Sequence, residues 1–525
     1  MKQHVVWFLW VILGLGVVFG SRKMALSFRF SDETDHTAIG HFIIEDGLNL
    51  YQDVISIHQP LPILVGGAIS QSISKVTLFT YMTQLRFVMS LLWFAGGSFL
   101  IYRFGWRGLG AALGLGVFSF AYFGWYVLAE SLVVVPVAAM VLLVLERLFE
   151  HKTRPRWWQE RFDWWLFGVA AFWLVFNLLP TAPFVGFAGI IYWLSYKKNR
   201  AEAFAHLLGG FMLPTALLFL LINPFAWWDQ TVMNLINYWF PVTPGQTDGA
   251  VWNMLLWPFQ TAMKDFNKPW VVLSLLMLIP PGYFIALKRW KTLGKLALLY
   301  CLVATLNIRS AEPGASFWRG FHAYPYIAGL LAWTAGAWWV LLTQKMNTAH
   351  LRAWSTLGAT LFTLFLYFAG AWLFTPSQRQ LRYEIEYLPI QAIVNVLNIL
   401  KQDGDKLWTG PDGQGHINVL TDLPFGDKQN FHLPWAFYSP YLKQDFYDTF
   451  ENTPPTFVYF NPGADADPYY EAVQQQLDAR YVELISPGGT PSQVWILRSR
   501  AEATSPEVWR RYEETYWGIP QGIPL

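Results

Sequence analysis

The amino-acid sequence predicts an α-helical polytopic membrane protein that ends in a small α/β domain. Composition is the first observation behind this. Of the 525 residues, 54% are hydrophobic and 14% are charged, whereas a soluble domain carries about 25% charged residues. The second observation is that the apolar residues are gathered into long runs. One aqueous core cannot bury so much apolar surface, so lipid must solvate part of it.

About eleven apolar runs qualify as spans, although several are shorter than the roughly 20 residues of a typical membrane helix. They cover residues 5–19, 87–102, 109–126, 132–148, 164–179, 184–196, 207–221, 270–287, 296–308, 324–342 and 357–374. No small-residue cleavage site follows the first run, so we expect an uncleaved span. Residues 61–73 form a short run with prolines at its start, which favours a half-inserted helix.

Lysine and arginine concentrate in alternate loops, around residues 103–107, 147–161, 197–200, 288–295 and 345–352. Cytoplasmic loops carry the excess of these residues, so the pattern predicts a cytoplasmic N-terminus. An odd number of spans then places the C-terminus outside. Arg22 and Lys23 depart from the pattern, and we assign them to snorkelling.

Three segments are then expected on the outer side: residues 22–86, residues 223–269 and everything after 374. The last has the composition of a soluble domain. It alternates expected strands (406–409, 456–461, 481–485 and 493–498) with expected helices (389–402 and 468–481). The predicted domains are therefore a membrane domain over 1–375, which includes the outer loop 22–86, and an extracytoplasmic α/β domain over 376–525.

The first outer loop begins with acidic residues. Asp32, Glu33 and Asp35 lie beside His36, and the apolar spacing of residues 39–43 predicts an amphipathic helix at the membrane interface. Carboxylates at a helix N-terminus often serve as caps. Three carboxylates and a histidine in six residues exceed what a cap needs, which indicates a site. The three carboxylates can also hold a divalent cation, although nothing in the sequence requires one.

Further motifs follow this acidic pair: Asp46-Gly47, Tyr51-Gln52-Asp53 and His58-Gln59-Pro60-Leu61. The set resembles that of the GT-C glycosyltransferases, which include protein O-mannosyltransferases and the aminoarabinose transferase of lipid A. The close resemblance covers residues 32–64, and a looser one covers the span pattern and the outer domain. It implies a GT-C-like bundle in a bacterial inner or plasma membrane. It also implies a polyprenyl-phosphate sugar donor and inverting transfer to an acceptor on the outer face, as in making cell-envelope glycans.

The resemblance also implies roles for individual residues. Asp32 is the candidate general base, and Glu33 orients it or binds sugar hydroxyls. Groups that can hold the donor phosphate and sugar are His58, Gln59, Arg86, Arg309, Arg319, His322 and Tyr324. Relatives often carry lysine at the position of Gln59. Because Gln59 brings no charge, more weight falls on His58 and the two loop arginines.

Two further acidic candidates are Asp53 and Glu130. Glu130 lies at the outer junction of two spans, where a carboxylate is either functional or a charge at a helix N-terminus. Trp227-Trp228 resembles part of an oligosaccharyltransferase motif, but the Tyr-Gly of that motif is missing. We therefore expect these two rings to be interfacial anchors.

The acceptor is left open among a glycolipid, a polysaccharide and a protein. The formal charge of +2 gives no information about nucleic acid, and no nucleic-acid partner is expected. The alternatives to an enzyme are a transporter or flippase of lipid-linked glycans, and a non-catalytic glycan-assembly protein. A transport path needs charges inside the spans, and these spans are nearly charge-free. The intact Asp32-Glu33 pair argues against the non-catalytic protein.

Overall fold

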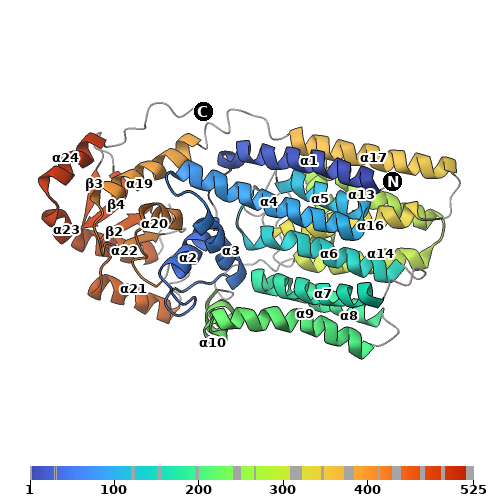
Figure 1. The fold of residues 1–525 in the computed structure, drawn as a ribbon, viewed down its shortest axis with the longest axis horizontal. Coiled ribbons are helices and arrows are strands. Elements are labelled where there is room, and N and C mark those ends of the chain that lie inside the picture. Colours follow the sequence, from blue (N-terminus) through green and yellow to red (C-terminus); the bar gives the residue numbers. More distant parts are fainter. Residues whose placement is uncertain are drawn as a thin grey trace. The chain divides into compact units, whose positions relative to one another are not determined.

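The computed structural model describes residues 3–28, 30, 32–119, 125–149, 157–195, 200–239, 250–264, 268–307, 322–344, 348–371, 383–410, 414–428, 439–461, 468–485 and 491–515. The chain divides into two compact units (Figure 1). The helical unit comprises Met1–Ala25, Arg86–Leu220 and Gly245–Thr375. The mixed unit comprises Leu26–Leu85, Leu221–Pro244 and Pro376–Leu525.

The helical unit is a bundle built around α6 (Ala129–Phe149) and α16 (Tyr324–Leu342), which pack against each other. Figure 1 shows α6, α7 and α8 side by side. Its other helices are α1 (Gln3–Met24), α4 (Leu78–Phe104, which begins in the mixed unit), α5 (Trp106–Phe118), α7 (Trp157–Asn177), α8 (Ala182–Leu194), α9 (Arg200–Leu221), α12 (Ala250–Lys264), α13 (Lys268–Ala286), α14 (Trp290–Ala304) and α17 (Thr348–Ala371), with short turns η3 (Leu179–Thr181) and η6 (Thr305–Asn307). Nearly all of α16 is buried, as expected of a helix that is apolar all round.

Every apolar run predicted as a span falls largely on a helix of this unit. Among the described residues, six helices are long and apolar enough to cross a membrane: α1, α4, α6, α9, α13 and α16. The count of eleven spans stays a prediction. The outward face of α9 exposes large apolar side chains, such as Leu217 and Leu220, which is the surface that lipid solvates.

Ion pairs join four helices at one end of the helical unit. Arg103 of α4 contacts Glu146 of α6 and Asp163 of α7, each at 2.8 Å. Arg107 of α5 contacts Glu146 at 2.6 Å, and its guanidinium lies over the Trp339 ring. Two of the arginines that indicated the cytoplasmic side therefore also have a structural role. Such partly buried pairs are costly to break once formed.

The mixed unit contains a close helical hairpin made of α2 (Glu33–Glu45) and α3 (Pro60–Ser72). A Cβ added at Gly40 would lie 2.1 Å from the Ile63 carbonyl oxygen and 2.5 Å from the Gly67 nitrogen. Only glycine allows the two backbones to approach in this way. At about 1.5 Å per residue, the 13 residues of α3 span about 20 Å. That is shorter than a hydrocarbon core of about 30 Å.

The C-terminal part of the mixed unit is the predicted α/β fold. Strands β1 (Leu407–Gly410), β2 (Phe457–Phe460), β4 (Pro491–Leu497) and β3 (Tyr481–Ile485) form one sheet in that order. β1 and β2 are parallel, and the other pairs are antiparallel. The helices are α19 (Leu388–Leu400), α20 (Gly415–Thr421), α21 (Pro440–Asn452), α22 (Pro468–Arg480), α23 (Arg498–Ala503) and α24 (Pro506–Thr515). All four expected strands and both expected helices are present, with ends shifted by at most two residues.

The remaining elements of the mixed unit are short: η1 (Ala25–Ser27), α10 (Pro224–Trp228), η4 (Asp229–Met233), η5 (Leu235–Trp239) and η7 (Tyr383–Tyr387). The sequence divided the chain at residue 375 and kept the loop 22–86 with the spans. The structure instead groups most of that loop, residues 26–85, with the C-terminal domain. The reason is packing, because α2 lies against α20.

Candidate functional site

The acidic start of α2 lies in the mixed unit, where Asp32 is half-buried. Asp32 is the N-cap residue, and its carbonyl oxygen accepts hydrogen bonds from the backbone nitrogens of Asp35 and His36, both at 3.1 Å. Its side chain makes no capping hydrogen bond, so capping does not account for it. The Glu33 and Asp35 side chains are fully buried. Burying carboxylates is costly, and clusters of this kind are typical of functional sites.

His58 lies beside this acidic start. Its ring meets the ring of His36 edge-on, with centroids 4.4 Å apart. The Tyr51 hydroxyl donates to the His58 carbonyl oxygen at 2.7 Å. Tyr51 is itself buried and has a φ of 72°, a conformation that bulky residues rarely adopt and that indicates a constrained loop. The structure therefore places His58 in contact with His36 of α2. It adds His36 and Tyr51, which stand in the sequence motifs but were not selected as site residues.

Gln59 is buried at the N-terminus of α3. Its Oε1 accepts a hydrogen bond from Nε1 of Trp227, at 3.1 Å. Trp227 was expected to be an interfacial anchor, and the structure gives its indole an inward partner as well. Trp228, by contrast, exposes 52% of its surface. The sequence could not reveal this bond, because the partners are 168 residues apart.

Arg86 is fully buried in the helical unit. It donates a hydrogen bond to the Ala25 carbonyl oxygen, and its guanidinium lies 4.6 Å from the centre of the Tyr126 ring. A cation over an aromatic face is attracted to it, more strongly when water is excluded. An ionisable side chain buried in a membrane protein is a functional candidate by default.

Two other candidates meet in the helical unit. Nδ1 of His322 lies 3.3 Å from Oε1 of Glu130, and Glu130 is buried. A carboxylate so placed orients the imidazole ring. The Tyr324 hydroxyl is also buried and shares a hydrogen bond with Ser119. Arg309 and Arg319 lie outside the described residues.

Asp53 stands apart from the acidic start of α2. Its carboxylate accepts hydrogen bonds from the backbone and the side chain of Asn49, at 2.8 and 2.7 Å. These two bonds lower the pKa of Asp53. Within the described part of the chain, no three or more His, Cys, Asp or Glu side chains are grouped so that they could hold a metal ion.

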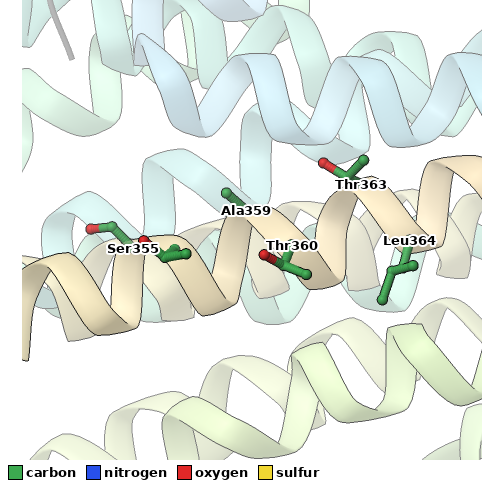
Figure 2. A pocket seen from close by; sticks show the side chains of 6 residues that line it. Ser355, Ala359, Thr360, Thr363 and Leu364 are labelled. Carbon is green, nitrogen blue, oxygen red and sulfur yellow. The ribbon is translucent and has the colours of Figure 1, made fainter.

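A hollow of about 500 Å³ lies along α17, lined by Ser355, Thr356, Ala359, Thr360, Thr363 and Leu364 (Figure 2). None of these side chains is ionisable. The hollow therefore offers neither a base nor a cation for a phosphate, and the chemistry must be sought in the residues above.

Comparison with known proteins identifies the fold. The sequence matches no described protein family and no curated protein. The structure is similar to ArnT from Cupriavidus metallidurans bound to undecaprenyl phosphate, with a TM-score of 0.54, 15% identity and coverage of 93% of this chain and 97% of that chain. It is also similar to the apo state of ArnT, with a TM-score of 0.52, 14% identity and coverage of 95% and 99%. ArnT is a GT-C glycosyltransferase, so the GT-C resemblance is confirmed for the fold. With its apolar helices, the chain is an integral membrane protein.

Proposed function

We propose that this protein is an inverting glycosyltransferase that moves a sugar from a polyprenyl-phosphate donor to an acceptor on the outer face of a bacterial membrane. The observation that carries the proposal is the acidic start of α2, where Glu33 and Asp35 are buried, in a chain with the fold of a protein solved with undecaprenyl phosphate. The fold similarity is not sufficient without the acidic residues, because one fold can host several activities.

In the proposed reaction, Asp32 is the general base. It takes the proton of an acceptor hydroxyl while the oxygen attacks the anomeric carbon from the face opposite the phosphate. The bond between that carbon and the phosphate oxygen breaks, and polyprenyl phosphate leaves. One base is sufficient, because the phosphate needs no protonation to depart. Glu33 is buried beside it and either orients Asp32 or accepts hydrogen bonds from the sugar.

Hydrogen-bond donors and positively charged side chains then have to stabilise the leaving phosphate. His58 is placed by Tyr51 and His36. We add Arg86 and His322 to this set on the sequence resemblance. Gln59 contributes through its amide and is oriented by Trp227. We include Arg309, Arg319 and Tyr324 in this set on the sequence resemblance.

The test is a transfer assay with the purified protein and a panel of polyprenyl-phosphate sugars. We expect wild type to release polyprenyl phosphate, and Asp32→Asn to be slower by about 10²- to 10⁴-fold, the usual contribution of a general base. Glu45→Gln is the matched control, because it removes one carboxylate at the other, exposed end of α2. Equal turnover by wild type and Asp32→Asn would exclude Asp32 as the base. Movement of a lipid-linked glycan across the vesicle membrane, without transfer of its sugar to an acceptor, would favour a flippase.

A further inference from the structure

A second hollow, of about 600 Å³, lies entirely within the mixed unit. Its walls come from the end of α2, the segment 48–54, the segment 424–428 and α21 with the turn after it. Asp53 is the only residue selected from the sequence that lines it. The volume falls within the range of about 300–1,000 Å³ that is typical of ligand sites.

Backbone hydrogen bonds hold the two facing walls in place. The Ile55 nitrogen donates to the Lys428 carbonyl oxygen at 2.7 Å, which ties the first loop to the C-terminal domain. The Gly426 nitrogen donates to the Leu407 carbonyl oxygen at 2.9 Å, which ties the second wall to β1. The Phe42 and Phe425 rings pack edge-on, with centroids 4.9 Å apart. These contacts fix the walls of the hollow, so its shape is set by the fold.

The lining combines an apolar floor with a polar rim. Phe42 and Phe425 are buried, whereas the rim carries five carboxylates and only two ammonium groups, those of Lys406 and Lys428. The carboxylates belong to Asp46, Asp53, Asp427, Asp445 and Asp448. Some are already oriented: Asp427 accepts from Trp408 Nε1 at 3.1 Å, and Asp53 accepts from Asn49. Acceptors fixed in advance lower the cost of binding a ligand.

We propose that this hollow, the rim cavity, binds a saccharide chain without acidic groups, as part of the acceptor. Sugar hydroxyls donate to carboxylates and accept from lysines, while the CH face of a sugar ring suits an aromatic floor. The excess of carboxylates repels phosphorylated or uronic saccharides. The proposal rests on the transferase function and narrows the acceptor to a glycan.

The geometry of α2 sets the size of this ligand. The helix begins at the acidic start and ends at the rim cavity, where Phe42 and Asp46 line the wall. Its 13 residues separate the two places by about 20 Å at 1.5 Å per residue. A single sugar cannot reach both, so the acceptor must be an oligosaccharide or longer.

The test measures direct binding to the full-length purified protein, without donor. The probes are chitohexaose, its fully deacetylated amine form, hexagalacturonate and hexalysine. We expect the first two to bind and hexagalacturonate to bind at least about tenfold more weakly. Equal or tighter binding of hexagalacturonate would overturn the proposal, as would binding of hexalysine alone, which would indicate a site for a basic polypeptide.

The variant is Asp427→Asn with Asp445→Asn, which keeps an oxygen acceptor for Trp408. It should bind chitohexaose about tenfold more weakly or worse, since each charged hydrogen bond lost costs roughly that factor or more. Asp478→Asn is the control, because that residue is exposed on α22 and outside the cavity. If the double variant binds chitohexaose as tightly as wild type, the rim cavity is not the saccharide-binding site.

Transfer and binding can fail separately. If the protein transfers sugar but binds none of the saccharides, only the proposal that the rim cavity binds a saccharide is overturned. A protein that binds them and consumes no donor in the panel overturns the transferase proposal, and with it the acceptor role of the cavity, but leaves the saccharide site standing.

Discussion

His41 of α2 is a buried histidine held in its neutral form. Gln71 Nε2 lies 2.9 Å and Lys75 Nζ 3.2 Å from its Nδ1, and both are donors, so that nitrogen must keep its lone pair. Burial, and then the charge of Lys75, lower the pKa of His41 to about 4, against opposing contributions from Glu45 and Asp422.

This pKa predicts a loss of stability in mild acid. In the unfolded chain the pKa of histidine is about 6.5, so between pH 6.5 and 4 the unfolded state binds more protons than the folded one. The free energy of unfolding therefore decreases as the pH falls through that window. Thermal unfolding of the purified protein should show a smaller difference in Tm between pH 7.5 and pH 5 for His41→Gln than for wild type.

His206→Gln provides the comparison, because His206 lies on α9, outside this network. It should keep the pH dependence of wild type. If His41→Gln lost as much Tm in acid as wild type does, the titration of His41 would not be the cause.

At the scale of elements, the α2–α3 hairpin decides where the acidic residues stand. The backbones meet at Gly40 and Gly67, and the Cβ of an alanine at Gly40 would clash with backbone atoms rather than with a side chain that can move. Overpacking of this kind costs about 1–3 kcal/mol, occasionally more. We expect Gly40→Ala to lower Tm and also to reduce transfer, because it displaces the start of α2.

Gly209→Ala is the matched control for this substitution. Gly209 lies on α9, and a Cβ there meets nothing within 4 Å. It should leave transfer unchanged and raise stability slightly, since alanine is favoured over glycine in a helix by roughly 0.5–1 kcal/mol. A Gly40→Ala protein as stable as the control would show that the hairpin can open without cost.

For the whole molecule, the charges of the short loops predict which side of the membrane the mixed unit faces. We predict that the mixed unit is extracytoplasmic. Its three segments overlap the three segments expected on the outer side from the alternation of lysine and arginine between the short loops and from the odd number of spans. In a Cys301→Ala background, a cysteine replacing Gln475 of α22 should react with an impermeant maleimide in intact cells. A cysteine replacing Gly294, which is exposed on α14, should react only after permeabilisation. The reverse pattern of labelling would invert the topology.

The sequence by itself determined the class of the protein and the order of its elements. Apolar runs, charge asymmetry and turn residues are local signals, so they predicted the helices, the strands of the C-terminal domain and the acidic stretch at Asp32 and Glu33. The pattern that resembles the GT-C transferases is equally local, and it led to the fold that the comparison with ArnT confirms.

Tertiary structure alone decided which distant residues meet. Glu130 and His322 are 192 positions apart and Gln59 and Trp227 are 168 apart, and no periodicity links either pair. The same holds for the mixed unit, which joins the first loop to the C-terminal domain, and for the rim cavity between them. Long-range contacts depend on how buried faces pack together in three dimensions. That packing, and not any local pattern in the sequence, determines which residues meet.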